Sequence, residues 1–187
     1  MTFCVALLGG SFDPVHHGHV ALAALFATLI QPDELRLIPA GNPWQKRALT
    51  ASAEHRIAML ELAFNDAQLS ITLDRQEVER STPTYTIDTL RNVRAERGAD
   101  ASIVFLIGAD QLQHHDTWRD WRALFDLAHI GVAARPGFSL AKAALPAVVA
   151  TELQQRQSSA QRSPRRYGWS ISGTRTPTPT LRSTRSW

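Results

Sequence analysis

A short apolar run that stops at two glycines constrains the fold of this chain more than any other feature. Phe3-Cys-Val-Ala-Leu-Leu8 is continuously apolar and is followed at once by Gly9-Gly10. Such a run is typical of a strand buried on both faces of a parallel sheet. The segment from Val20 to Ile30 is apolar nearly all round, which predicts a helix packed against that sheet. The chain therefore opens as strand, loop and helix.

The same alternation continues along the sequence. We expect further strands at Leu35–Pro39, Leu69–Leu73, Ser102–Ile107 and Ile130–Ala133, and further helices at Ala53–Phe64, from Thr84 or Thr86 to about Arg97, at Trp118–Leu127 and at Ala141–Gln157, the last interrupted by Pro146. Strands that alternate with helices indicate right-handed crossovers between parallel strands. The sequence thus predicts an α/β fold with a doubly wound parallel sheet.

Composition narrows the class of protein. With 187 residues, 44% of them hydrophobic and 20% charged, the chain has the length and balance of one globular domain. The single Cys4 excludes an internal disulfide, which suits a reducing compartment. No run approaches the roughly 20 apolar residues that a membrane span needs. We therefore expect a cytoplasmic protein with no membrane partner.

The basic charge is confined to the C-terminal part. Residues 1–150 carry 13 Lys and Arg against 16 Asp and Glu, whereas residues 151–187 carry 7 Arg against Glu152 alone. We expect one domain over residues 1–156 and a basic, poorly ordered tail rich in Ser, Thr and Pro over residues 157–187. Because the domain itself is not basic, nucleic acid is not an expected partner. An oligomer is possible.

The strongest chemical signal is the segment Gly9-Gly-Ser-Phe-Asp-Pro-Val-His-His-Gly-His19, between the first strand and the first helix. Its glycines let the backbone come close to a ligand. A helix N-terminus directs free N–H groups and partial positive charge at an anion. His16 and His19 are three residues apart and so fall on one side of the helix start. The segment predicts a phosphate-binding site.

Two other interpretations of this segment stay open. It could be a tight turn with surface imidazoles, or the two histidines could hold a metal ion. A third metal ligand is not obvious, and we predict no protein-held metal. The segment is neither a Walker phosphate loop, because no Lys-Ser/Thr follows, nor a GxGxxG dinucleotide fingerprint.

Gly-Gly-Ser-Phe-Asp-Pro-x-His-x-Gly-His resembles the signature of the nucleotidylyltransferase superfamily. From Phe3 to about Arg156 the chain resembles the bacterial nicotinate-nucleotide adenylyltransferase family in several separate motifs. This resemblance implies a Rossmann-like, three-layer α/β/α fold. It also implies transfer of AMP from ATP to nicotinate mononucleotide, giving deamido-NAD (nicotinate adenine dinucleotide) and pyrophosphate, with Mg²⁺ bound mainly through the ATP phosphates.

The resemblance assigns the ATP side to the first motif and to one loop. It makes His16 and His19 the catalytic pair that contacts the ATP phosphates, and it adds to the ATP-binding residues Gly9, Gly10, Ser11, Phe12 and Lys46. Lys46 could equally be a solvated loop charge.

The resemblance assigns the nicotinate mononucleotide to residues further along the chain, namely Thr84, Tyr85, Thr86, Asp110, Trp118 and Arg135. Each has an ordinary alternative. The threonines could cap a helix, Asp110 could lie in a surface turn and Arg135 could be a surface charge. Of the two neighbouring tryptophans, we expect Trp118 to meet the ligand and Trp121 to lie in the core.

The chain departs from the family near its C-terminus. Ile171-Ser-Gly-Thr174 matches the first half of a second phosphate motif, which assigns Ser172 and Thr174 to ATP, but Pro177 stands where the family has an arginine. The loss of acids and apolar periodicity after Glu152 also raises the hypothesis of an altered reading frame or a truncated end. Two alternatives remain: a phosphopantetheine-type nucleotidylyltransferase or, because the second phosphate motif is incomplete, a nucleotide-binding chain with impaired catalysis.

Overall fold

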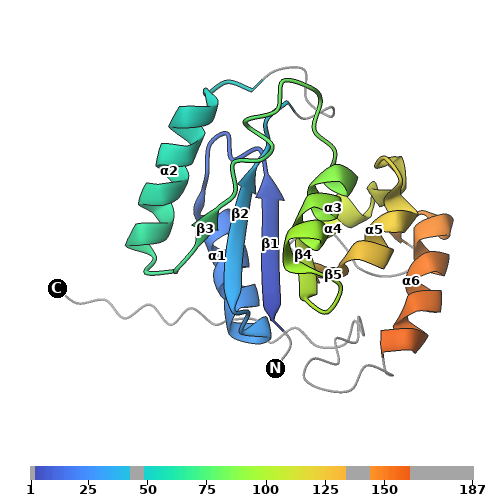
Figure 1. The fold of residues 1–187 in the computed structure, drawn as a ribbon. Helices are drawn as coiled ribbons and strands as arrows, with labels where there is room; N and C mark the ends of the chain where they lie inside the picture. The colour runs from blue at the N-terminus through green and yellow to red at the C-terminus, as the bar shows by residue number, and fades with distance from the viewer. Residues whose placement is uncertain (1–2, 43–48, 134–143, 161–187) are drawn as a thin grey trace.

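A parallel sheet forms the centre of the molecule. The computed structural model describes residues 3–42, 49–133 and 144–160, with the backbone alone at 157–160. Its five strands run in the order β3-β2-β1-β4-β5 (Figure 1). They are β1 (Cys4–Gly10), β2 (Glu34–Pro39), β3 (Thr72–Leu73), β4 (Ser102–Gly108) and β5 (His129–Ala133).

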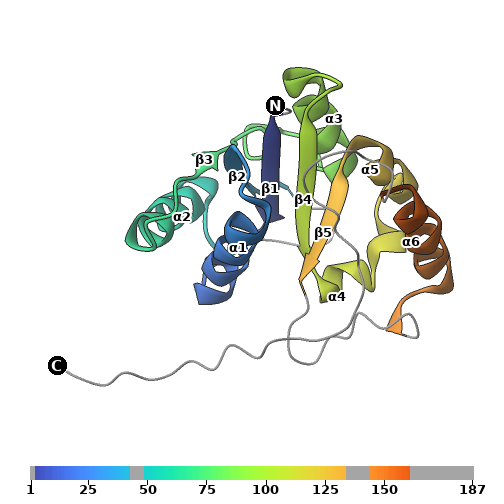
Figure 2. The same cartoon turned by 90° about the horizontal axis from the view of Figure 1, so that it is seen from below.

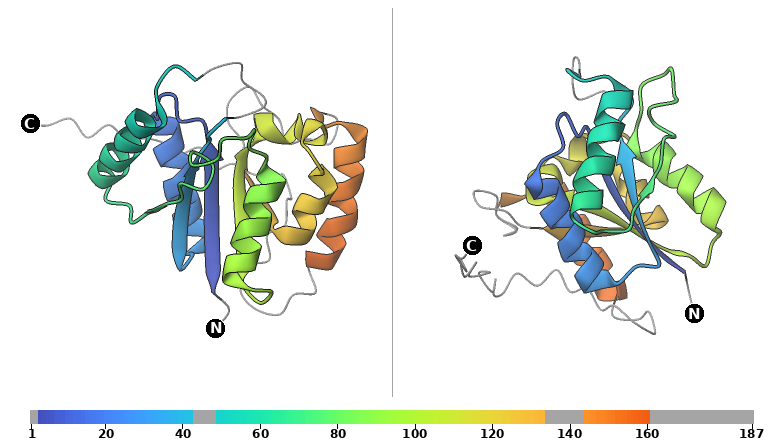
Figure 3. Two further views of the ribbon diagram at one scale, coloured as in Figure 1. Left: turned by 45° about the horizontal axis from the view of Figure 1, so that its top comes forward. Right: turned by 90° about the vertical axis from the view of Figure 1, so that its left-hand side faces the viewer.

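Helices cover both faces of the sheet. They are α1 (His17–Ile30), α2 (Ala53–Asp66), α3 (Thr86–Arg97), the short α4 (Ala109–Leu112), the 3-10 turn η1 (His115–Thr117), α5 (Trp121–Leu127) and α6 (Ala147–Ala160). One core joins β1 and β2 to α1 and α2, and a second joins β1 and β4 to α3, α5 and α6. Figure 2 and the right panel of Figure 3 show these layers. The expected three-layer α/β/α fold is confirmed.

The first strand supplies side chains to both cores. Val5 and Leu7 are fully buried under α3, while Ala6 and Leu8 are buried under α1. This two-sided burial explains the continuous apolar run seen in the sequence. Because β1 pairs with both β2 and β4, the winding of the chain reverses between β1 and β4. Ligands of open α/β sheets collect at the carboxyl ends of the strands at such a switch point.

Helix α1 and strand β3 have boundaries that differ from the expected ones. Helix α1 begins at His17 and not at Val20, so His19 lies in its first turn. The strand expected over Leu69–Leu73 is reduced to Thr72–Leu73, which pairs only with β2 at the edge of the sheet.

The helix expected over Trp118–Leu127 is wrong in its first turn. The chain instead forms η1 and then an irregular step, in which Asp120 has a left-handed φ of 50°, before α5 begins at Trp121. The expected threonine cap is also wrong, because the N-cap position of α3 is Tyr85, whose side chain makes no capping hydrogen bond.

The last described helix starts later than expected. Helix α6 begins at Ala147, so Pro146 precedes it, and the Pro146 carbonyl accepts hydrogen bonds from the backbone N–H groups of Val149 and Ala150. A proline is tolerated at a helix start because the N–H it lacks would have no partner there. Within the described part of the chain, no helix has the length and apolar character needed to cross a membrane.

Candidate nucleotide-binding site

A cavity of about 530 Å³ opens at the carboxyl ends of β1 and β4. This size suits a small-molecule site. Five residues assigned to ATP from the sequence line it, namely Gly9, Gly10, Ser11, His16 and His19. The structure thus brings the end of β1 and the start of α1 together on one wall.

The two histidines of the motif lie ring against ring. The His16 and His19 rings stack with their centroids 3.8 Å apart and their planes at 24°. The backbone N–H of His16 donates to Nδ1 of His19 at 3.3 Å. A neutral imidazole that accepts at Nδ1 carries its proton on Nε2, where it can donate to a ligand. The pair is therefore held in one orientation at the mouth of the cavity.

The start of α1 adds to the attraction for an anion. This helix is 14 residues long and has no acidic residue in its first turn, so its positive end is uncompensated there. Gly18 leaves room for the stack, since a Cβ at this position would lie 3.0 Å from the His16 ring. The site can therefore bind phosphate oxygens through imidazole and backbone N–H groups.

Phe12 is a buried residue that packs against one of the two histidines. Its side chain is fully buried, and its ring meets the His19 ring edge-on at a centroid distance of 4.9 Å. The backbone of Phe12 has a left-handed φ of 47°, a costly conformation for a residue with a large side chain. Phe12 therefore supports His19, while the nucleotide-facing surface comes from its neighbours.

Helix α2 anchors the loop that carries the motif. The Asp13 carboxylate accepts hydrogen bonds from the backbone N–H groups of Thr50 at 2.5 Å and Ala51 at 3.0 Å. Arg56 of α2 is almost fully buried and donates to the Ser11 carbonyl at 2.8 Å. Burial lowers the pKa of the Arg56 guanidinium, and the nearby Asp13 carboxylate opposes this effect. Side chains distant in sequence thus fix the shape of the loop.

The opposite wall of the cavity comes from β4 and the start of α3. All five described residues assigned to nicotinate mononucleotide line it, namely Thr84, Tyr85, Thr86, Asp110 and Trp118. Thr84 is buried, and its backbone N–H donates to the Asn42 carbonyl at 3.1 Å, which ties this wall to the loop after β2.

The two tryptophans have the different environments expected from the sequence. Trp121 is 8% exposed and packs into the core under α3 and α6. Trp118 is half-buried, lies edge-on to Phe105 at 6.2 Å and lines the cavity. The assignment of Trp121 to the core is confirmed, and Trp118 offers an aromatic surface to a ligand.

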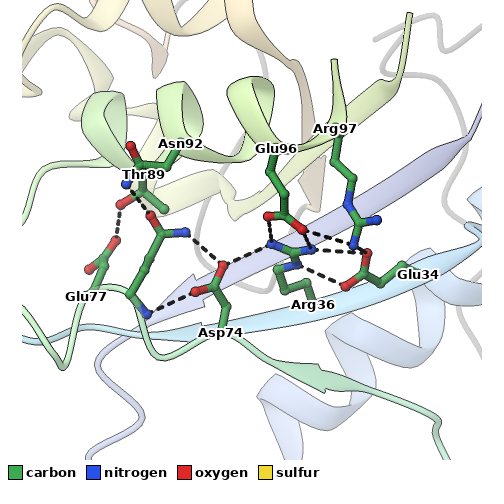
Figure 4. Close-up of polar contacts among 9 residues, drawn as sticks. Glu34, Arg36, Asp74, Glu77, Thr89, Asn92, Glu96 and Arg97 are labelled. Atoms are coloured by element: carbon green, nitrogen blue, oxygen red, sulfur yellow. Dashed lines mark hydrogen bonds and ion pairs between the residues drawn. The ribbon is translucent and has the colours of Figure 1, made fainter. Parts of the chain in front are cut away.

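Sequence reasoning missed Glu77, a carboxyl group in the cavity wall. The Thr89 hydroxyl donates to Glu77 Oε1 at 2.7 Å (Figure 4). Burial raises the pKa of the Glu77 carboxyl, and the Thr89 hydrogen bond opposes this. The Glu77 carbonyl oxygen lies 1.8 Å from where a Cβ on Gly41 would stand, so only glycine fits there. This approach joins segments 36 residues apart and gives no local sequence signal.

Arg119 is the second residue that sequence reasoning missed. It lines the cavity, and its Cζ lies 4.7 Å from the centroid of the Tyr85 ring. Its position directly after Trp118 is the only signal that could have pointed to it.

Four assigned residues lie outside the described residues, namely Lys46, Arg135, Ser172 and Thr174. Within the described ranges, no group of three or more His, Cys, Asp or Glu side chains could hold a metal ion.

The chain is similar in sequence to proteins of one known family. A family model described as cytidylyltransferase-like matches residues 7–173. A Herminiimonas arsenicoxydans protein named probable nicotinate-nucleotide adenylyltransferase is 58% identical over 156 residues, which cover 83% of this chain and 71% of the relative. A Chromobacterium violaceum protein of the same name is 49% identical over 155 residues, covering 82% and 71%. The chain belongs to the nicotinate-nucleotide adenylyltransferase family.

Solved structures support the fold of this family member. It resembles Plasmodium falciparum nicotinic acid mononucleotide adenylyltransferase complexed with NaAD, with a TM-score of 0.63 and 18% identity over 83% of this chain and 84% of that one. The same Plasmodium enzyme complexed with APC gives a TM-score of 0.58 and 18% identity, covering 80% and 70%.

Proposed function

We propose that this chain transfers the AMP group of ATP to nicotinate mononucleotide, releasing pyrophosphate and forming nicotinate adenine dinucleotide. The observation that carries the proposal is the stacked His16–His19 pair at the start of α1, in the cavity that Trp118 also lines. The relatives at 58% and 49% identity bear the name of this activity. We propose that the reaction takes place in the cytoplasm.

The reaction needs no covalent enzyme intermediate. A phosphate oxygen of nicotinate mononucleotide attacks the α-phosphorus of ATP. The bond from that phosphorus to the oxygen bridging the α- and β-phosphates breaks in line, and pyrophosphate carries away the electron pair. The attacking phosphate is already an anion at neutral pH, so no strong general base is required. Catalysis is then mainly positioning and stabilisation of charge on phosphoryl oxygens.

The two walls divide this work. We assign His19, whose Nδ1 is occupied by the His16 backbone, to donate from Nε2 to the oxygens of the reacting phosphate. We assign His16 and the N-terminus of α1 to the β-phosphate side. The acceptor lies along Thr84, Tyr85 and Thr86, with Trp118 stacking on its pyridine ring.

The oxygen ligands in the cavity would fit a Mg²⁺ ion that binds together with the nucleotide, held mainly by its phosphates. Its described lining includes the carboxyl residues Glu77 and Asp110, and the described residues hold no cluster of three or more ligands for a protein-bound ion. Mg²⁺ keeps much of its water and prefers phosphate oxygens in such sites, where it neutralises phosphate charge. The histidines then need to hold the triphosphate but not the metal.

A test of pyrophosphate release with ATP and nicotinate mononucleotide uses three single variants of one motif. His19→Ala is expected to lose about a hundredfold or more in kcat, as for removal of a preorganised donor. His16→Ala is expected to lose activity as well. His17→Ala is the matched control, because His17 is exposed and does not line the cavity. A normal rate in His19→Ala would remove this histidine from the mechanism.

The same assay separates the alternatives. The sequence has Pro177 where the family has arginine, and this favours a second candidate, a chain that binds ATP but turns over poorly. Binding of ATP without pyrophosphate release would support that candidate. Release with phosphopantetheine but not with nicotinate mononucleotide would replace the proposed acceptor.

A further inference from the structure

The cavity has an uneven charge inventory. Among the described residues that line it, the carboxyl groups belong to Glu77 and Asp110, and Arg119 is the one arginine or lysine. The histidine pair stands at the mouth on the α1 side. Both proposed substrates are anions. The cavity wall formed by β4 and the start of α3 therefore needs a positive charge if it is to bind an anionic group of a ligand. Arg119 is the described residue that supplies one.

Arg119 is held in place by an aromatic ring. Its guanidinium lies over the Tyr85 ring at 4.7 Å, a distance typical of a cation–π contact. Its neighbour Asp120 pairs with Arg91 at 3.7 Å, and no described carboxylate lies within ion-pair distance of Arg119 itself. When the flat face of a guanidinium stacks on an aromatic ring, the N–H groups at its edge can still donate hydrogen bonds to a planar anion such as a carboxylate.

The topology decides which anion this is. The reacting phosphate of the acceptor must reach the nucleotide phosphates beside α1, which packs on one face of the sheet. Tyr85 and Trp118 pack against the core on the other face, under α3 and α5. The end of the acceptor nearest Arg119 is therefore the pyridine ring, remote from the phosphate.

We propose that Arg119 is a specificity-determining residue, which pairs with the carboxylate of the pyridine ring and selects the acid form of the mononucleotide over its neutral amide. The proposal rests on the proposed function and goes beyond it, because it names the side chain that reads the acceptor's charge. An amide in this place would leave the guanidinium without a counter-charge. Arg119 is exposed, so solvent screens its charge, and we expect a charge-assisted pair there to discriminate by up to about tenfold.

The test compares kcat/KM for nicotinate and nicotinamide mononucleotide at saturating ATP. Arg119→Gln is expected to reduce the ratio of the two values by up to about tenfold, through KM for the acid form, with KM for ATP unchanged. Arg119→Lys is expected to recover part of the ratio because it keeps the charge. Arg122→Gln is the matched control, since Arg122 is exposed and contacts Trp121 and Glu152 away from the cavity.

Two kinetic outcomes would overturn the proposal. One is an unchanged ratio in Arg119→Gln. The other is an equal loss with both acceptors, which would place Arg119 at the phosphate. If the unmodified chain turns over neither acceptor, the proposed function fails but the role of Arg119 does not. Calorimetry would then compare the affinities of the two mononucleotides, and an equal affinity of both for the unmodified chain would refute the proposal.

Discussion

Replacing Arg36 by leucine should destabilise the protein more than any exposed charge substitution. Arg36 lies in β2, is 5% exposed and stands between the sheet and α3 (Figure 4). Its guanidinium donates to Glu34 Oε1 at 3.0 Å, to Asp74 Oδ2 at 3.2 Å and to both carboxylate oxygens of Glu96 at 2.7 and 3.0 Å. One buried cation thus joins strand β2, the segment after β3 and helix α3.

The loss of stability in Arg36→Leu depends on how deeply the carboxylates that lose Arg36 are buried. The side chains of Glu34 and Asp74 are each 11% exposed, whereas that of Glu96 is 49% exposed. Removing one partner of a buried ion pair costs about 3–5 kcal/mol, because the remaining charge is uncompensated. Arg97 still pairs with Glu34, which favours the lower end. We expect a loss of about 3 kcal/mol, equivalent to a fall in Tm of about 10 °C in a domain of this size.

The assay is urea unfolding followed by circular dichroism, at pH 7 and again at pH 4. The control is Arg91→Leu, whose exposed pair with Asp88 should be worth less than about 1 kcal/mol. The hydrogen bond from Arg36 holds the pKa of Glu96 below its usual value. A carboxyl group with a depressed folded pKa stabilises the protein above its unfolded pKa, and this contribution is lost as the pH falls.

The difference in free energy of unfolding between the unmodified protein and Arg36→Leu should therefore shrink on acidification. Protonated carboxyl groups carry no charge that the guanidinium must compensate. A variant as stable as Arg91→Leu at pH 7 would refute the reasoning. So would a deficit that is the same at pH 4 as at pH 7.

Two further substitutions test other parts of the structure. His115→Leu should raise the free energy of unfolding by about 1 kcal/mol, since both ring nitrogens of His115 are buried without a hydrogen-bond partner among the described residues. Burial lowers the pKa of His115 from 6.5 to about 4, so the unmodified protein loses stability as the pH falls through that window. The gain, measured by urea unfolding, should be larger at pH 5 than at pH 7, and no gain at pH 5 would contradict it. Gly41→Ala should force the Glu77 carbonyl away from β2, lowering Tm and raising KM for the acceptor, and unchanged values of both would contradict it.

The sequence predicted the parts of the fold that depend on local pattern. The apolar run from Phe3 to Leu8 predicted a strand buried on both faces, and β1 lies between β2 and β4 in the middle of the sheet. The spacing of His16 and His19 predicted two imidazoles on one side, and the stacked rings agree with this. The sequence predicted the start of α5 three residues too early. The backbone of Asp120 is left-handed, and composition does not show this.

Contacts between distant segments could not be predicted from one sequence. Arg36 meets Asp74 across 38 residues and Glu96 across 60, and nothing in β2 indicates an arginine buried under a helix. The same holds for Glu77, which enters the cavity wall only because Gly41 lets another backbone approach. Local pattern fixes which elements form, whereas these long-range polar contacts decide which side chains reach the site.

The motif loop depends on such contacts as well. Asp13 connects it to Thr50 and Ala51, just before α2, and Arg56 connects it to α2 through the carbonyl of Ser11. The buried Arg56 guanidinium places a positive charge beneath the loop, and the nearby Asp13 carboxylate partly offsets it. The attraction of this loop for phosphate therefore has three sources: the imidazoles in the motif, the end of α1 and a cation from another helix. Only the first two can be seen in the motif itself.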